Sequence, residues 1–341
     1  MCYIYIGEKL KVFYYKSKNG NFGDDINSWL WDRLLPDFFD DDETTRLSGI
    51  GTIIDSYMPH AQKWYVMSSG VGYGFPPSHF GKDNWNILCV RGPLSANILN
   101  LPKEKFITDG AAFLNKIPEF SPIPENQRRG VIFIPHHYAV HAGEWEKVCK
   151  LAGVEFVNPE SDSKYVLEKI RNAKLVLADA MHAAIIADAF RVPWVPMVTS
   201  PQINTFKWLD WTSTINQRYT PIVLGSSSLK EMVRSKGLFL HGEKYYNEKL
   251  DVESSIKQFK IQRKIKSSAL WPYYRKPASF IVNRVAINIA SMVEKSQHQK
   301  FLDKSALILA NASQQHGFLS DDKIFENNLG RLHHCLNALR K

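Results

Sequence analysis

The sequence predicts an α/β fold with two doubly wound, Rossmann-like domains followed by a basic helical extension. Short β-rich runs alternate with helical patterns through residue 250, which is typical of βα units stacked around parallel sheets. A segment with three prolines, residues 116–130, divides the alternation into two series, as a linker would. The 341 residues suffice for two cores. We therefore expect an N-terminal domain over 1–120, a second domain over 130–250 and an extension over 251–341.

Each domain is expected to contain a series of buried parallel strands with helices between them. The strands expected in the first domain are Lys11–Tyr15, Gly51–Asp55, Trp64–Ser69, Asn86–Val90 and Lys105–Asp109. Those expected in the second are Val131–Pro135, Val154–Val157, Lys174–Ala178 and Pro193–Val198. One of the expected helices is Met181–Phe190. Since doubly wound sheets bind ligands at the carboxyl ends of their strands, the residues after each strand are the candidate site.

The composition, 44% hydrophobic and 12% aromatic, is that of a globular protein. No run reaches the roughly 18 apolar residues of a membrane span, and the N-terminal run becomes charged too early for a signal peptide. The four cysteines form no CxxC pair; they are Cys2, Cys89, Cys149 and Cys335. We therefore expect a cytoplasmic protein with reduced thiols.

The net charge of +9 is concentrated in the extension, which contains 15 basic and 7 acidic residues. Between Ser254 and Val293 there are eight basic residues and no acidic one, interleaved with aromatic side chains. This pattern does not indicate a nucleic-acid channel. It predicts one peripheral surface for an anionic partner, which we expect to be the inner face of a membrane. The alternative is that Ala278–Val293 is a helix packed onto the first domain.

The turn after the first strand, "GNFGDD", contains an unusual number of small polar residues before an amphipathic helix. Asn21, Gly23, Asp24 and Asp25 lie where a helix needs a cap. The same backbone N–H groups can receive an anion or a sugar hydroxyl. The turn is therefore either a capped βα connection or part of a binding site.

The later strand ends also carry polar groups. They are Gly72 and Tyr73 in "GVGYG", Arg91 in "VRGPLS", the pair His136 and His137, Met181 and His182 in "DAMH", and Thr199 with Ser200. A cation at a helix start is unfavourable, so the placement of Arg91 favours a bound anion. His136, His137 and His141 could suggest zinc. Neighbouring residues point in opposite directions, however, and no acidic or thiol ligand is near, so we expect no metal site.

Together these motifs resemble the polysaccharide pyruvyl transferase family, in particular its bacterial exopolysaccharide ketal-forming branch. The blocks that carry the resemblance are "GNFGDD", "GIGT", "SSGVGYG", "VRGPLSANIL", "ITDGAAFL", "FIPHHY" and "ADAMHAAIIADAFRVPWVPM". They span about residues 10 to 220, and the last block is the most specific.

The resemblance implies a two-domain fold like that of GT-B glycosyltransferases. It implies transfer of a pyruvyl group from phosphoenolpyruvate onto two hydroxyls of one sugar, in a surface polysaccharide or its lipid-linked precursor. The product is a cyclic ketal, and phosphate is released. Family members hold phosphoenolpyruvate with an arginine and histidines, which map to Arg91, His136 or His137, and His182. Many members have an arginine where this chain has Ala180, so part of the phosphate clamp must come from elsewhere or from the helix N-terminus.

The chemistry agrees with these residue types. Phosphoenolpyruvate is a small anion, which we expect to lie on the second-domain side. Met181, His182, Thr199 and Ser200 would hold it there, and Arg91 would contact it from the first domain across the cleft. His136 or His137, with His182 as the fallback, would transfer protons, and Asp24 would accept one from the sugar. The residues expected at the acceptor, on the first-domain side, are Asn21, Gly23, Asp25, Gly72 and Tyr73. No cofactor or metal is required by this scheme.

Two other functions stay open. A GT-B glycosyltransferase would need a carboxylate for the ribose of a nucleotide-sugar, and after Thr199 the candidates are Asp210 and Glu231. A non-enzymatic binding protein would use the basic tail to hold nucleic acid or membrane. Clustering of Arg91, His182 and a second histidine in one cleft would argue against the binding protein.

Overall fold

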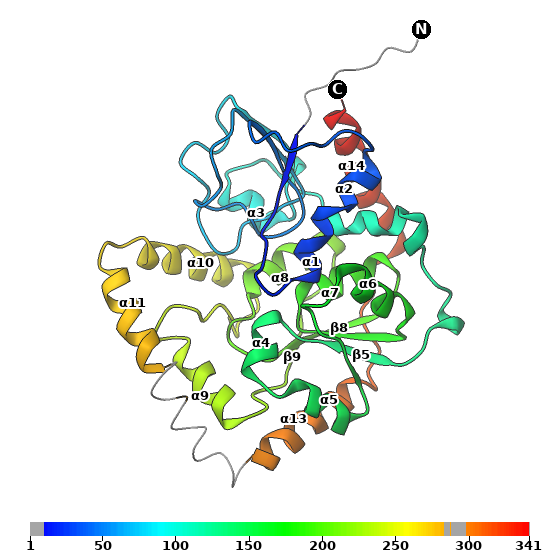
Figure 1. Cartoon of the computed structure of the whole chain (residues 1–341), viewed down its shortest axis with the longest axis vertical. Coiled ribbons are helices and arrows are strands. Elements are labelled where there is room, and N and C mark those ends of the chain that lie inside the picture. The colour runs from blue at the N-terminus through cyan, green and yellow to red at the C-terminus, as the bar shows by residue number, and fades with distance from the viewer. Residues whose placement is uncertain (1–9, 283–286, 288–297, 341) are drawn as a thin grey trace.

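The computed structural model describes residues 10–282, 287 and 298–340, and contains two parallel sheets (Figure 1). The first has the order β1-β2-β3-β4, with bounds Lys11–Phe13, Thr45–Ser48, Lys63–Met67 and Trp85–Cys89. The second has the order β6-β5-β7-β8-β9, with bounds Glu155–Phe156, Val131–Ile134, Leu175–Ala178, Trp194–Val198 and Ile222–Val223. The α/β class is therefore confirmed, and strands β2 and β9 were not expected.

The second sheet is doubly wound, as predicted. Strand β5 pairs with β6 on one side and with β7 on the other, so the chain reverses its direction of travel between β5 and β7. Alternate residues of β7 enter different apolar clusters. Leu175 and Leu177 pack towards α5 (Trp145–Ala152) and α13 (His298–Ala312), while Val176 and Ala178 pack towards α6 (Ser163–Asn172) and α7 (Met181–Ala189). Such a reversal leaves a crevice at the carboxyl ends of the two strands.

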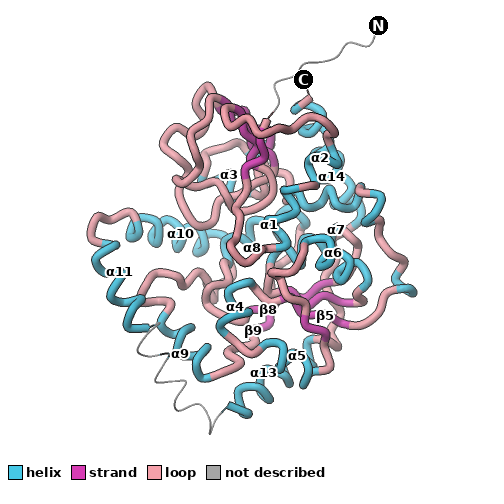
Figure 2. The backbone as a smooth tube through the Cα atoms, viewed as in Figure 1, coloured by secondary structure: helices cyan, strands magenta, loops and turns pink. Residues whose placement is uncertain are grey.

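The first sheet is not doubly wound, which corrects the prediction for this half. Its strands follow one another without a reversal, and no helix joins β2 to β3 or β3 to β4. Figure 2 shows this lobe built mostly of loops. The connecting segments 49–62 and 68–84 are rich in glycine and proline, which disfavour helix. The expected strand Gly51–Asp55 is one of these loops, with Gly51 at φ +114°, and Lys105–Asp109 makes only a single bridge to Val90.

The remaining helices surround the two sheets. In the first half they are α1 (Phe22–Asp25), α2 (Leu30–Leu34) and α3 (Pro93–Ile98). In the second half they are α4 (His137–Ala142), α8 (Thr205–Thr212) and α9 (Leu229–Gly237). One continuous apolar cluster includes residues of both sheets, among them Leu47, Val66 and Val176. The halves are therefore packed together, and residues 116–130 connect them through short turns at Pro118–Phe120 and Glu125–Gln127.

The extension packs on the body. Helix α10 (Val252–Lys266) lies against α8 through Phe259, and α11 (Trp271–Phe280) follows it. Helix α14 (Asp322–Leu339) returns to β4 in the first half, beside α2 in Figure 1. Of the expected helix over 278–293, residues 283–286 and 288–293 lie outside the described residues. Among the described helices, none combines the length and apolarity that crossing a bilayer requires.

Candidate active site

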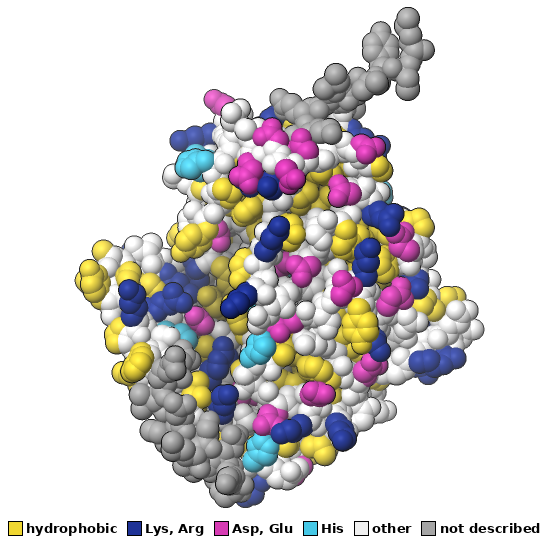
Figure 3. Space-filling view, in the orientation of Figure 1, with side chains coloured by type: hydrophobic (Ala, Val, Ile, Leu, Met, Phe, Trp, Pro, Cys, Tyr) yellow, Lys and Arg dark blue, Asp and Glu magenta, His cyan; other side chains and the backbone are white. Residues whose placement is uncertain are grey.

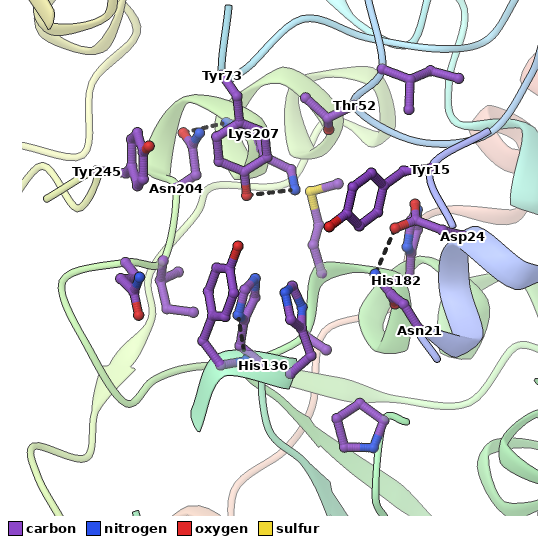
Figure 4. A pocket seen from close by; sticks show the side chains of 18 of the residues that line it. Tyr15, Asn21, Asp24, Thr52, Tyr73, His136, His182, Asn204, Lys207 and Tyr245 are labelled. Atoms are coloured by element: carbon purple, nitrogen blue, oxygen red, sulfur yellow. Dashed lines mark hydrogen bonds between the residues drawn. The ribbon is translucent and has the colours of Figure 1, made fainter. Parts of the chain in front are cut away.

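A cavity of about 630 Å³ lies between the two halves, at the carboxyl ends of β5 and β7 (Figure 4). The sequence-predicted residues that line it are Asn21, Asp24, Tyr73, His136, His137, Met181 and His182. The predicted residues that do not line it are Gly23, Asp25, Gly72, Arg91, Thr199 and Ser200. The cavity thus combines groups from both halves, and about half of the predicted set lies in the layer behind its wall.

Asp179 fixes the floor of the cavity by joining the ends of three neighbouring strands. Its Oδ2 accepts hydrogen bonds from the backbone N of His136 (2.7 Å) and from Thr199 Oγ1 (2.8 Å), and its Oδ1 accepts one from the backbone N of Thr199 (2.9 Å). Burial raises the pKa of Asp179 to about 6, and these hydrogen bonds hold it from rising further. Thr199 therefore positions Asp179 and does not face the cavity, while Ser200 Oγ accepts from the backbone N of Gln202.

Three histidines line the cavity, and all three are neutral near pH 7. Burial, with a contribution from Lys207, lowers the pKa of His182 to about 3 and that of His137 to about 4. Burial also lowers the pKa of His136 well below its usual range. His136 Nδ1 accepts from the backbone N of Tyr138 (3.4 Å), and His182 Nε2 is buried without a hydrogen-bond partner among the described residues. The three histidines are therefore neutral imidazoles near pH 7, each with one donor and one acceptor nitrogen.

The turn after β1 brings a carboxyl group to the histidines. Asp24 Oδ2 accepts from Asn21 Nδ2 (2.6 Å), and burial raises the pKa of Asp24 to about 7 although Lys207 opposes the rise. Asp25 accepts from the backbone N of Asn21 (2.9 Å), so it stabilises the turn. Gly23 packs on the ring of His182, because a Cβ at Gly23 would lie 2.0 Å from His182 Nδ1.

Lys207 on α8 is the cation that sequence reasoning missed. Its Nζ lies 3.3 Å from the hydroxyl oxygen of Tyr73 and 4.8 Å from the ring centroid (Figure 4). Among the described residues, no carboxylate lies within ion-pair distance of this amine. Burial and the nearby Arg91 lower the pKa of Lys207 to about 8, while Asp24 and Asp109 raise it. The available signal was a lysine between Phe206 and Trp208 in the helix "TFKWLDWT".

Gly72 makes room for this lysine, since a Cβ there would lie 2.8 Å from Lys207 Cγ. Its carbonyl also accepts a hydrogen bond from Asn204 Nδ2 (2.9 Å) across the two halves. Gly72 therefore supports the wall, and the adjacent Tyr73 forms it.

Arg91 lies behind the cavity wall, fully buried. Its Nε lies 3.0 Å from Asp210 Oδ2, its Nη1 donates to Thr52 Oγ1 (2.7 Å), and its Nη2 donates to the carbonyl of Val71 (3.2 Å). Asp210 also accepts from the backbone N of Ser95 (2.8 Å) in the first turn of α3. The cation at this helix start is therefore compensated by Asp210, so its placement does not by itself require a bound anion. Binding of the donor by Arg91 itself stays a prediction.

The two carboxylates proposed for a nucleotide-sugar are committed to internal contacts. Asp210 pairs with Arg91, and Glu231 accepts from the backbone N of Ser227 (2.6 Å) and from Trp145 Nε1 (3.0 Å). Neither lines the cavity. The arrangement therefore gives no support to ribose binding by Asp210 or Glu231.

Two further features describe the cavity. Tyrosines form much of its wall; Tyr73 and Tyr245 meet edge to face at 5.4 Å, and Tyr15 and Tyr138 also contribute. Within the described part of the chain, no group of three or more histidine, cysteine, aspartate or glutamate side chains is placed to hold a metal ion. The site can thus offer a cation, neutral histidines, a carboxyl group of raised pKa and flat amphipathic rings.

Comparisons with known proteins agree with the resemblance seen in the motifs. The family model of polysaccharide pyruvyl transferase matches residues 67–201, which include β3 to β8. The succinoglycan biosynthesis protein ExoV of Rhizobium meliloti (strain 1021) is 41% identical over 213 residues, covering 62% of this chain and 67% of that protein. No solved structure matches the chain. This chain belongs to the polysaccharide pyruvyl transferase family.

Proposed function

We propose that the protein transfers the pyruvyl group of phosphoenolpyruvate onto two hydroxyls of one sugar, forming a cyclic ketal and releasing phosphate. The sugar would belong to an exopolysaccharide or its precursor, in line with the role of ExoV in succinoglycan biosynthesis. The observation that carries the proposal is the convergence of Lys207, three histidines and Asp24 in one cavity built from both halves.

The donor would bind at the Lys207 end. Lys207 is protonated at pH 7, because its pKa is about 8, and it has no ion-pair partner among the described residues. An anion there would gain a charge-assisted hydrogen bond without displacing an existing partner. This cation would also take the place of the arginine that is missing at Ala180, since Lys207 and His182 line the same cavity. Arg91, one layer deeper, adds positive potential through its effect on both groups.

The reaction needs one proton delivered and two removed. A proton goes to the methylene carbon of phosphoenolpyruvate, giving an oxocarbenium-like centre at the adjacent carbon. The first sugar hydroxyl attacks this carbon and loses its proton. The second hydroxyl then attacks the same carbon, loses its proton, and the carbon–oxygen bond to phosphate breaks.

The pKa values suggest how the roles are divided. Asp24, with a pKa near 7, is poised to exchange a proton with the sugar at neutral pH. His136, His137 and His182 are neutral near pH 7 because their pKa values are lowered, so they act first as bases or hydrogen-bond donors. A bound anion would raise their pKa values, and one of them would then become the acid. We assign that role to His136 or His137, with His182 as the fallback.

The acceptor would lie along the tyrosine wall. Tyr15, Tyr73, Tyr138 and Tyr245 present flat rings with polar ends, which suit the apolar faces and hydroxyls of a sugar. Asn21 lines the same side as Asp24 and would help to orient the reacting hydroxyls. No metal or cofactor takes part in this proposal.

The test is to incubate the purified protein with phosphoenolpyruvate and candidate sugars or lipid-linked oligosaccharides. We expect phosphate release together with the mass gain of a pyruvate ketal. Thermal-shift measurements with phosphoenolpyruvate and a panel of nucleotide-sugars provide the control, and we expect stabilisation by phosphoenolpyruvate alone. Stabilisation by a nucleotide-sugar, with glycosyl transfer, would support the glycosyltransferase alternative.

The reaction is proposed to occur in the cytoplasm, with α10 docking on an anionic membrane surface. Lys257, Lys260 and Lys264 are exposed on α10, whereas Arg263 is buried. Vesicle binding should therefore depend on the three exposed lysines and weaken at high salt. Equal binding to neutral vesicles, or none to either, would contradict the docking.

A further inference from the structure

A second group of cations lies beside the cavity, on the side of α10 and α11. Arg263 and Lys266 are on the inward side of α10, and Arg275 of α11 lines the cavity. The guanidinium carbon of Arg263 lies 5.8 Å from the ring centroid of Tyr245, and Lys266 Nζ lies 4.7 Å from it. Tyr245 lies across the cavity from Asp24 in Figure 4. The cations are therefore at the end away from the proposed proton transfer.

Figure 3 shows Lys and Arg side chains gathered on the lobe formed by α9, α10 and α11, beside a hollow in the surface. Of the three cations beside the cavity, Arg263 is buried, Lys266 is half-buried and Arg275 is half exposed. They are thus distinct from the exposed lysines of α10, which face solvent.

The carboxylates near these three cations are too few to neutralise all of them. Glu243 accepts from Arg275 Nη2 (3.2 Å) and also from Gln202 Nε2 (2.9 Å). Arg263 is 8% exposed, and its Nε and Nη2 have no hydrogen-bond partner among the described residues. Asp55, on the facing wall, interacts with Arg263 through charge. Buried guanidinium N–H groups without acceptors are costly, so this arrangement favours an external acceptor.

Lys266 is also repelled by the neighbouring cations, as its pKa indicates. Burial lowers its pKa to about 7, and Arg263 and Arg275 lower it further while Glu243 opposes them. Its Nζ has the hydroxyl of Tyr245 as a partner at 2.9 Å. A bound anion would relieve this repulsion and return the proton to the amine.

We propose that Arg263, Lys266 and Arg275 form an anion subsite that holds a phosphate or diphosphate ester carried by the acceptor. The three cations outnumber the two carboxylates beside them, Glu243 and Asp55. Two of the cations are guanidinium groups, whose paired N–H donors suit the oxygens of a phosphate ester. With the ester there, the sugar would lie along Tyr245 and Tyr73, and its hydroxyls would reach Asp24. The identity of the ligand as the acceptor rests on the proposed function.

The probe is inorganic pyrophosphate, titrated calorimetrically into the full-length protein. The titration is repeated on Lys207→Met, which removes the donor-side cation, and on wild type saturated with phosphoenolpyruvate. We expect pyrophosphate to bind in both cases. Lys266→Gln and Arg275→Gln should each weaken binding by about 10-fold or more, as expected for a charged contact. The matched control is Lys264→Gln, on the exposed face of the same helix, which should leave binding unchanged.

Arg263→Gln is expected to weaken binding similarly, but its side chain is buried and the variant can fail to fold. Arg275 is half exposed, so Arg275→Gln tests the subsite without that risk. Anionic vesicles form a second arm of the experiment. Loss of vesicle binding in Lys266→Gln, with pyrophosphate binding retained, would assign these cations to a membrane surface and overturn the proposal.

Two other results would also overturn it. Pyrophosphate binding that disappears in Lys207→Met would place the anion at the donor end. If Lys264→Gln weakened pyrophosphate binding equally, the binding would depend on general surface charge and not on a specific subsite. The proposed function fails separately: if phosphoenolpyruvate does not bind while pyrophosphate binding still depends on Lys266 and Arg275, the anion subsite stands and the donor assignment falls.

Discussion

Two cations at α8, the buried Arg91 beside the helix and the half-buried Lys207 on it, have opposite surroundings. Arg91 is paired with Asp210 at 3.0 Å and donates to Thr52 and to a backbone carbonyl. Lys207 lies three residues before Asp210 on the same helix, yet its amine meets a tyrosine hydroxyl at 3.3 Å and no carboxylate within ion-pair distance among the described residues. The two clusters therefore share a helix and differ in whether their charge is compensated.

The difference shows that one helix can carry both a paired charge, which stabilises the fold, and an unpaired charge, which is available to a ligand. A buried ion pair with complete hydrogen bonding holds its groups in place, and breaking it is expensive. A buried cation without an ion-pair partner lowers stability but leaves capacity for an anion. The shifted pKa values of Lys207 and Asp24 are typical of groups whose charge is not fully compensated by a partner. We thus assign the Arg91–Asp210 pair to fastening the halves and Lys207 to the donor.

The largest expected effect is on stability, at the ion pair between Arg91 and Asp210. Asp210→Ala should lower the free energy of unfolding by about 3–5 kcal/mol, because the guanidinium of Arg91 is left buried without its partner. Chemical denaturation measures this loss. Arg91→Ala should destabilise similarly and also raise the KM for phosphoenolpyruvate. If Arg91→Ala keeps normal stability while that KM rises, the guanidinium binds the donor directly and the comparison fails.

The next largest expected effect is on catalysis, at Lys207, the cation without an ion-pair partner among the described residues. Lys207→Met should lower kcat/KM by about 100- to 1,000-fold, as expected for loss of a preorganised charged donor. The unfolding free energy should not fall, because methionine fills the space without burying a charge. Lys207→Arg is the matched variant that keeps the charge. Near-normal turnover in Lys207→Met would return the donor site to Arg91.

A smaller effect is expected at the contact between the halves. Gly23→Ala should cost about 1–3 kcal/mol through overpacking, because the new methyl group would meet the ring of His182. Gly330→Ala is the control, since nothing lies within 4 Å of a Cβ there. If Gly23 acts through His182, the loss of activity should shrink in a His182→Ala background. Fully additive losses in the double variant would contradict this coupling.

The smallest effect is a pH dependence, amounting to about tenfold per pH unit on each side of the optimum. If Asp24 must be ionised and Lys207 protonated, kcat/KM should rise through about pH 7 and fall above about pH 8. Asp24→Asn should remove the lower limb. It should also move the upper limb to lower pH, because the Asp24 carboxylate raises the pKa of Lys207. A profile unchanged in Asp24→Asn would assign the lower limb to another group.

The same carboxyl group gives a stability signature. Its pKa is raised from 3.8 to about 7 in the folded protein, so the folded state binds the proton more tightly than the unfolded state. Asp24 therefore favours folding below about pH 4, and this advantage is lost as the pH rises to about 7. Thermal melts of wild type and Asp24→Asn over this range should diverge with increasing pH. Parallel curves would contradict the raised pKa.

The second sheet and its share of the site were predictable from the sequence, because the information there is local. Strands β5, β7 and β8 are short apolar runs, and β5 and β7 are each followed at once by residues that line the cavity. The position of a residue directly after a parallel strand already places it at one edge of the sheet. His136, His137 and His182 could therefore be predicted as a group from the sequence, as could the α7 helix.

The first sheet and the charge pattern were decided by tertiary structure. Glycine- and proline-rich connections replaced the expected helices, and the apolar run Gly51–Asp55 became a loop that carries Thr52 into the cavity wall. Whether a cation is paired depends on residues far apart in the chain: Arg91 meets Asp210, 119 positions away, while Lys207 meets Tyr73, 134 positions away. Residue types alone identified basic groups near the site, but burial and long-range pairing determined which of them has charge left for a substrate.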